Sequence, residues 1–277
     1  MTLEEAEKLK KVQLEIMDEI DRICEDNNIC YYIVGGTLIG AIRHKGFIPW
    51  DVDMDIAMPR KEYDRFKRIC SDQLDIKYQY CDYTNVENYD RPHAVVCVKN
   101  TKLISNTDKL CPERKNLGIF IDVFPLDGVP NDEKERRNHI KRINHYKRMR
   151  YLRIPYYTSP SKIKRMGRRV IKTLLNWISI YKLNIKMDEC MKKYNDWPCS
   201  KLCNMAGRYS YEKEALEKEV FGTPVKVDFE GRKYNAPEMY DKYLRHIYGD
   251  YMKLPPKEEQ TGFLNTYDSI DFGTIKF

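Results

Sequence analysis

The chain has 277 residues, a mass of 33.1 kDa, 49 Lys or Arg against 42 Asp or Glu, and a mean hydropathy of −0.68. One or at most two domains are expected, because a single hydrophobic core usually stops growing at roughly 250–300 residues. An aromatic content of 12% argues against a disordered chain, and no stretch approaches the ~20 apolar residues that cross a bilayer.

The N-terminus and the cysteines indicate a cytoplasmic location. MTLEEAEKLKK is acidic and polar, whereas a signal peptide is first basic and then apolar. Nine cysteines are scattered along the chain without a Cys-x-x-Cys pair, which favours reduced thiols over a zinc or disulfide framework.

The positive charge is concentrated in one segment. Residues 134–172 contain 15 Lys or Arg and one acid, a net charge of +14, which leaves −7 for the rest of the chain. Such a segment predicts an anionic partner, although a solvated helical face explains it as well. The apolar stretch 170–183 follows directly and has the composition of an interfacial helix with Trp177 at headgroup level, or of a core helix.

In the first part of the chain, helices and strands alternate. Thr2 and Glu5 form a capping box ahead of apolar residues spaced three and four apart, which predicts a helix to about residue 26. A short strand is expected over 29–34, one or two helical turns over 37–43 with Thr37 as N-cap, a strand over 51–58 and a helix over 61–74. Residues 93–104 and 118–124 have the composition of two further strands, and 125–130 is expected to be a turn that Asp127 helps to fix.

The rest of the chain is expected to be helical and then mixed. Helix dominates from 131 to about 196, with a break at 155–160; a hairpin turning at Glu230-Gly231 and a helix over 237–248 follow. The predicted class is α+β, with a mixed sheet flanked by helices, a mainly helical basic insertion and a small C-terminal part. The expected parts are a catalytic core over 1–130, a basic helical region over 131–196 and a C-terminal part over 197–277 that packs on the core.

Three acids at alternating positions predict a metal site. Asp51, Asp53 and Asp55 share one side of the expected strand, and such crowding of like charges is costly unless a cation lies among them. Oxygen ligands favour Mg²⁺ or Mn²⁺. Asp122, a single acid in an apolar strand, is a candidate third ligand. The plain alternatives are a solvent-facing edge strand and an acid that caps a turn.

A glycine pair precedes the acidic strand. Gly35 and Gly36 end the first strand and open a helix at Thr37, where backbone N–H groups can approach a phosphate. The glycine pair is a weak signal by itself. The order of strand, glycine pair, helix, two-acid strand and third-acid strand is that of the nucleotidyltransferase fold, which builds a metal-dependent phosphoryl-transfer site.

Three blocks then carry a specific resemblance. The segments GGTLIGAIRHKGFIPWDVDMDIAMPRKEYDRF (35–66), IFIDVFPLDGVP (119–130) and YGDYMKLPP (248–256) resemble the LicD family of phosphotransferases, which is related to the fukutin-type enzymes. The likeness covers nearly the whole chain and is weakest over 131–220. Val52 departs from the family pattern, which usually has a further Asp there, but Asp53 and Asp55 are kept.

The resemblance implies transfer of a phospho-alcohol, typically phosphocholine, from a CDP-linked donor to a sugar hydroxyl of a surface glycan or its lipid-linked precursor. On this reading Asp53, Asp55 and Asp122 are the catalytic and metal-binding residues. Asp122 would bind a second metal or accept the proton of the sugar hydroxyl, and CMP would leave.

Several residues are candidates for contact with the substrate, each with a plain alternative. Arg43 and Lys45 lie in the loop before the acidic strand and could bind phosphate, or simply be surface charges. Trp50 could cover a quaternary ammonium, although packing against the helix explains it better. Asp250, with its neighbours Tyr248 and Gly249, is implied only by the family motif. Gly35, Gly36 and Thr37 complete the predicted set.

Two other functions fit part of the pattern. A nucleotidyltransferase acting on RNA or a small molecule would keep the fold and use the basic segment on nucleic acid, but no RNA-binding motif is found. A non-enzymatic basic adaptor for anionic membranes would leave the three aspartates unexplained. The enzyme is therefore expected in the cytoplasm, at the inner face of the plasma membrane if the basic segment contacts lipid.

Overall fold

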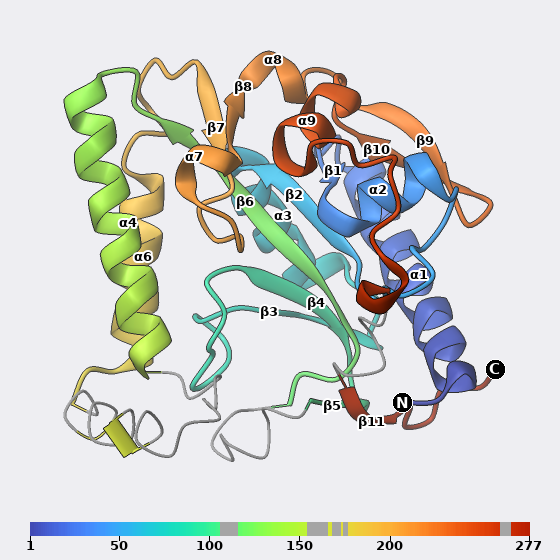
Figure 1. Ribbon diagram of the computed structural model, residues 1–277. Helices are drawn as coiled ribbons and strands as arrows, with labels where there is room; N and C mark the ends of the chain where they lie inside the picture. Colours follow the sequence, from blue (N-terminus) through green and yellow to red (C-terminus); the bar gives the residue numbers. More distant parts are fainter. Residues whose placement is uncertain (106–115, 154–165, 168–172, 174–176, 261–266) are drawn as a thin grey trace.

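The structure is a computed structural model that describes residues 1–105, 116–153, 166–167, 173, 177–260 and 267–277. A mixed sheet in the order β1-β2-β6-β4-β3 forms its centre, and β7 and β8 extend it from the far end of β6 (Figure 1). The strands of this sheet are β1 (Tyr32–Ile33), β2 (Asp55–Pro59), β3 (Tyr78–Cys81), β4 (Ala94–Val98), β6 (Phe120–Val129), β7 (Lys201–Cys203) and β8 (Ala215–Glu217). β2 and β6 are parallel, and the other neighbouring pairs are antiparallel.

Helices flank this sheet, as the sequence predicts. They are α1 (Leu3–Asp26), α2 (Gly35–Arg43), α3 (Arg60–Gln73), α4 (Glu133–Arg153), α6 (Ile180–Lys192), α7 (Tyr211–Glu214), α8 (Lys218–Phe221) and α9 (Tyr240–Tyr248), with a short 3₁₀ turn, η2 (Lys257–Glu259). α4 and α6 lie side by side, and the two chain ends meet near α1, where Lys8 lies over the ring of Phe277 (Figure 1).

Local sequence signals account for the elements that match the prediction best. The capping box of Thr2 and Glu5 is present, with the Thr2 hydroxyl accepting from the Glu5 N–H at 3.1 Å, and α1 runs to Asp26. The hairpin of β9 (Val225–Phe229) and β10 (Arg232–Ala236) turns at Glu230-Gly231, where both residues have positive φ. These predictions are confirmed because the signals act within a few residues of each other.

Three predicted boundaries are wrong. The first strand has only two residues, and β2 begins at Asp55 rather than at residue 51. The expected strand 93–104 is divided into β4 and β5 (Lys102–Ser105), and β5 pairs with β11 (Tyr267–Asp271) outside the main sheet.

A further error concerns the predicted turn at 125–130, which is the second half of β6. Pro125 lies between the residues of β6 that pair with β4 and those that pair with β7. No strand that the structure describes on that side needs a hydrogen bond from this position, so the N–H that proline lacks is not missed. Asp127 therefore does not fix a turn. It is fully buried within the strand, where Arg60 holds it through two bonds of 2.7 Å.

Among the described residues, the apolar side chains form one large core, a smaller one and two minor clusters. The large core combines side chains from α1, β2, β6 and α3 with others from α8, α9 and the β9–β10 hairpin. The smaller one lies between α4, α6 and β7 and includes Ile143, Met187 and Cys203. The division at residues 130 and 196 stays a prediction. Six of the fourteen residues of the expected interfacial stretch 170–183 lie outside the described residues. Within the described part of it, Trp177 is 82% exposed, whereas Ile180 and Leu183 are buried.

Candidate active site

Two of the predicted acids lie side by side on neighbouring strands. Asp55 opens β2 and is the register partner of Asp122 in the parallel strand β6, so both side chains leave the same face of the sheet. Burial, followed by the charges of Asp122 and Asp53, raises the pKa of Asp55 well above its ordinary value. The sheet therefore brings together two carboxylates that are 67 positions apart in the sequence.

Asp53 and Asp51 complete the acidic cluster from the segment before β2. Burial, followed by the charges of Asp51 and Asp122, raises the pKa of Asp53 to about 7. Burial also raises the pKa of Asp51, whose carboxylate accepts from the Asp53 N–H at 3.3 Å. The hydroxyl of Tyr267 donates to Asp53 at 3.1 Å. Such raised pKa values are typical of carboxylates that lack a counterion.

Asp122 differs from the other three because it has cationic and imidazole partners. Arg91 and the Nε2 atom of His93 both lie 2.8 Å from its Oδ1 atom. Burial alone would raise the pKa of Asp122, but Arg91 and His93 hold it below its ordinary value. Asp122 is therefore ionised at neutral pH.

The glycine pair lies directly against the acids. The N-cap of α2 is Val34 rather than Thr37, and Gly35, with φ +60°, opens the helix. A Cβ atom on Gly35 would lie 3.0 Å from the Asp55 carboxylate, and one on Gly36 would lie 2.6 Å from that of Asp51. Thr37 has a different role from the expected cap: its hydroxyl accepts the Asp55 N–H at 2.8 Å and so positions the start of β2.

The two loop candidates, Arg43 and Lys45, lie in different surroundings. The Arg43 guanidinium donates to the main-chain oxygen of Tyr251 at 2.6 Å, which ties α2 to the segment after α9. Lys45 is exposed and lies near Asp228 of the hairpin, whose pKa is lowered chiefly by its bond to Lys233 and to a smaller extent by the charge of Lys45. Their roles as phosphate ligands stay predictions.

Trp50 and Asp250 also have defined places. Trp50 is half-buried, with the Arg43 guanidinium 6.0 Å from its ring centre and the His44 ring packed edge-on at 6.1 Å. Asp250 is exposed in the turn that follows α9. Asp250 comes two residues after Tyr248. The Tyr248 hydroxyl lies close to Gly35, since a Cβ atom added there would be 3.8 Å from it.

Four residues near the acids were not singled out as site residues from the sequence: Arg91, His93 and Tyr267, together with Tyr248, which entered only through the family motif. Arg91 and His93 directly precede the apolar run of β4, and an arginine and a histidine at the start of a strand are a signal that could have been used. Tyr267 gives no such signal, because it reaches Asp53 from 214 residues away.

The cluster has the chemistry of a Mg²⁺ or Mn²⁺ site, although it is not closed around an ion. Its donors are carboxylate oxygens, three of the four acids have raised pKa values, and the absence of side chains at Gly35 and Gly36 lets the backbone lie directly against two of them. Across the described ranges, no three His, Cys, Asp or Glu side chains are already arranged to hold a metal. Mg²⁺ usually binds one or two carboxylates together with water and substrate phosphate, which an open cluster can supply.

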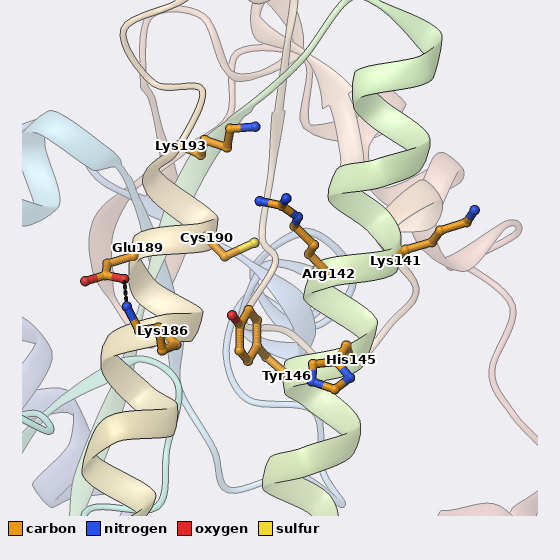
Figure 2. Close-up of a pocket in the computed structure, with 8 residues that line it drawn as sticks. All are labelled: Lys141, Arg142, His145, Tyr146, Lys186, Glu189, Cys190 and Lys193. Carbon is orange, nitrogen blue, oxygen red and sulfur yellow. Dashed lines mark hydrogen bonds and ion pairs between the residues drawn. The ribbon is translucent and has the colours of Figure 1, made fainter.

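A basic hollow lies between α4 and α6 (Figure 2). It has a volume of about 410 Å³, and Arg142 and Lys193 extend into the space between the helices. Lys186 is paired with Glu189 at 2.9 Å. Among residues that the structure describes, Lys141 and Arg142 have no carboxylate partner. The basic segment thus presents positive charge in a concave surface.

Among the described residues, every helix is too short or too polar to cross a bilayer.

Comparison with known proteins decides the family. The family model of the LicD/FKTN/FKRP nucleotidyltransferase domain matches residues 28–168, just over half of the chain. The chain belongs to this family. It is 33% identical to the lipopolysaccharide cholinephosphotransferase LicD of Haemophilus influenzae over 261 residues, which cover 90% of this chain and 92% of that protein. Two uncharacterised rickettsial proteins match shorter parts: RP689 of Rickettsia prowazekii is 29% identical over 42% of this chain and 39% of its own length, and RT0683 of Rickettsia typhi is 40% identical over 20% and 18%.

Proposed function

We propose that this LicD-family phosphotransferase moves a phospho-alcohol, in the first instance phosphocholine, from a CDP-linked donor to a sugar hydroxyl of a cell-surface glycan or its lipid-linked precursor. The observation that carries the proposal is the similarity to a cholinephosphotransferase along nearly the full length of both chains. The in-register pair of Asp55 and Asp122 lies in the part matched by the family model and supports it.

In the proposed mechanism the three aspartates bind the metal ion. Asp53 and Asp55 would hold Mg²⁺ or Mn²⁺, with Asp122 as the further ligand. When bound, such an ion neutralises the charge of the diphosphate and of the leaving CMP. The lowered pKa of Asp122 favours a ligand role over that of proton acceptor, because a group that stays ionised is a weak base. The backbone at Gly35 and Gly36 leaves room for the phosphates.

An assay of the released nucleotide tests the proposal. The protein is incubated with CDP-choline, CTP or ATP, with Mg²⁺ and a glycan acceptor, and the products are separated. Release of CMP from CDP-choline is expected, with choline phosphate on the acceptor. Pyrophosphate released from CTP or ATP would instead support a nucleotidyltransferase. CDP-ribitol, CDP-glycerol and CDP-ethanolamine are compared in parallel, because they present the same CDP end.

The Gly35→Ala variant should lose activity through crowding of Asp55. Its Cβ would meet the carboxylate at 3.0 Å, and alanine is strained at a φ of +60°. Gly231→Ala is the matched control, because φ there is +73° and a Cβ would meet nothing within 4 Å. Both variants should lose about 1 kcal/mol of stability, but CMP release should fall about tenfold or more only in Gly35→Ala. An equal loss in both variants would contradict a role for this position in the site.

The basic hollow supports a cytoplasmic enzyme held at an anionic membrane surface. The protein should float with vesicles that contain phosphatidylglycerol at low salt, and less so at 0.5 M NaCl, because exposed charges are screened. Arg142→Glu with Lys193→Glu should weaken flotation, whereas Lys233→Glu on the β9–β10 hairpin should not. Equal flotation of all three proteins would remove the hollow as the contact surface.

A further inference from the structure

Three nitrogen-bearing side chains gather beside Asp122 from two parts of the chain. Arg91 and His93, just before β4, both contact its Oδ1 atom at 2.8 Å. Arg150 comes from the last turn of α4, which follows β6 in the chain and lies along one side of the sheet (Figure 1). Its guanidinium donates to the main-chain oxygen of Asp90, the residue before Arg91.

These side chains are buried without a full set of partners. Arg150 is 5% exposed, and the side chains of Arg91 and His93 are 17% and 10% exposed. Among the described residues, Arg91 Nε, His93 Nδ1 and Arg150 Nη1 have no hydrogen-bond partner. A buried polar group without a partner is costly, and most such groups in proteins are bonded to protein, water or ligand. Three in one place indicate that something polar belongs there.

The charges around the three side chains identify that group as an anion. Burial lowers the pKa of Arg150 to about 10, opposed by the charge of Asp90. Arg91 forms an ion pair with the Asp122 carboxylate at 2.8 Å, whereas Arg150 donates to a main-chain oxygen. Of the two arginines, Arg150 is therefore the less well compensated.

We propose that Arg150 and Arg91 bind phosphate oxygens of the substrate beside Asp122, at the edge of the Asp53, Asp55 and Asp122 cluster. This inference rests on the proposed function, and it names the residues that hold the diphosphate. Guanidinium groups suit this role because they are planar, remain charged and bind two phosphate oxygens at once. A diphosphate bound at this edge of the cluster would have its charge balanced by the divalent ion and by the two arginines.

Binding measurements test the proposal without relying on turnover. Isothermal titration with CDP and with inorganic pyrophosphate, each with Mg²⁺ and with EDTA, is carried out on the wild type and on Arg150→Met. The variant should bind both probes about 10- to 100-fold more weakly, the cost of a lost charged hydrogen bond. It should keep its melting temperature, because removal of a poorly compensated buried charge offsets the bond lost to Asp90. Arg148→Met, at an exposed position two residues earlier on α4, is the control and should bind like the wild type.

The outcomes separate this inference from the proposed function. If the wild type binds pyrophosphate but not CDP and Arg150→Met loses pyrophosphate, the arginines keep their role and the CDP-linked donor is wrong. Unchanged affinity of Arg150→Met for both probes would overturn the inference, and so would a wild type that binds neither. Arg150→Lys keeps the charge and should restore part of the affinity. If Arg150→Met does not fold, Arg150→Lys decides. An Arg150→Lys protein that binds both probes as tightly as the wild type would then contradict a two-oxygen contact.

Discussion

Asp53→Asn should abolish phospho-alcohol transfer and at the same time stabilise the metal-free protein. The Asp53 carboxyl lies among Asp51, Asp55 and Asp122, and burial together with these charges raises its pKa from 3.8 to about 7. The amide keeps an oxygen for the Tyr267 hydroxyl but carries no charge. CMP release should fall about 100- to 1,000-fold or more, as expected when a group that stabilises transition-state charge is removed.

The stability gain has a defined pH window. Because the folded pKa lies above the unfolded one, ionisation of Asp53 destabilises the fold fully above about pH 7 and not at all below about pH 4. Asp53→Asn should therefore melt about 8–16 °C higher than the wild type at pH 8 and equally at pH 4. This corresponds to about 4 kcal/mol, since the pKa is raised from 3.8 to about 7 and each pH unit costs about 1.4 kcal/mol.

Mg²⁺ supplies a further readout and Asp72→Asn the control. An ion that binds only the folded state raises the melting temperature by mass action, so Mg²⁺ should stabilise the wild type but not Asp53→Asn. Asp72 is exposed at the end of α3, and its replacement makes the same change in charge away from the cluster. Retained activity, or an unchanged response to Mg²⁺ in Asp53→Asn, would remove Asp53 from the metal site.

The sequence was most informative where the signal is local. The capping box of Thr2 and Glu5 and the turn at Glu230-Gly231 each act within a few residues, and both are found as expected. The acids were recognisable for a related reason: like charges at alternating positions are costly wherever the chain folds. Their convergence with Asp122 was inferred from the order of motifs, and the parallel pairing of β2 and β6 supplies it.

The parts that the sequence did not predict depend on contacts between distant segments. Thr37 could be expected to cap a helix from its residue type, but its hydroxyl accepts the Asp55 N–H from 18 positions away. Pro125 normally ends a strand, yet β6 continues through it because β4 and β7 pair with different halves of that strand. Arg150 lies within a run of basic residues, and only the fold separates it from its exposed neighbours by burying it.

Arg60→Met should cause the largest loss of stability, because it leaves a carboxylate buried without its counterion. Arg60 follows β2 directly, five residues after Asp55, and Asp127 lies five residues after Asp122 on β6. Their two bonds of 2.7 Å therefore join the two acid-bearing strands at the end away from the site.

The expected cost follows from the burial of this pair. The two side chains are 5% and 0% exposed, and Asn195 would be left as a neutral partner for Asp127. Removal of one partner from such a pair costs about 3–5 kcal/mol, which lowers the melting temperature by about 6–15 °C. Arg137→Met is the control. It breaks an exposed ion pair with Glu133 within α4 and should cost no more than about 0.5 kcal/mol.

A double variant separates the lost pair from lost packing around Arg60. Arg60→Met with Asp127→Leu removes both charges and should recover a large part of the stability, because apolar side chains of similar size can replace a buried ion pair. Denaturant unfolding of the two single variants and the double variant gives the interaction energy of the pair. Additive losses would mean that the pair does not hold β2 against β6. An interaction energy above about 2 kcal/mol would instead show that the alignment of Asp55 with Asp122 depends on an ion pair five residues beyond each of them.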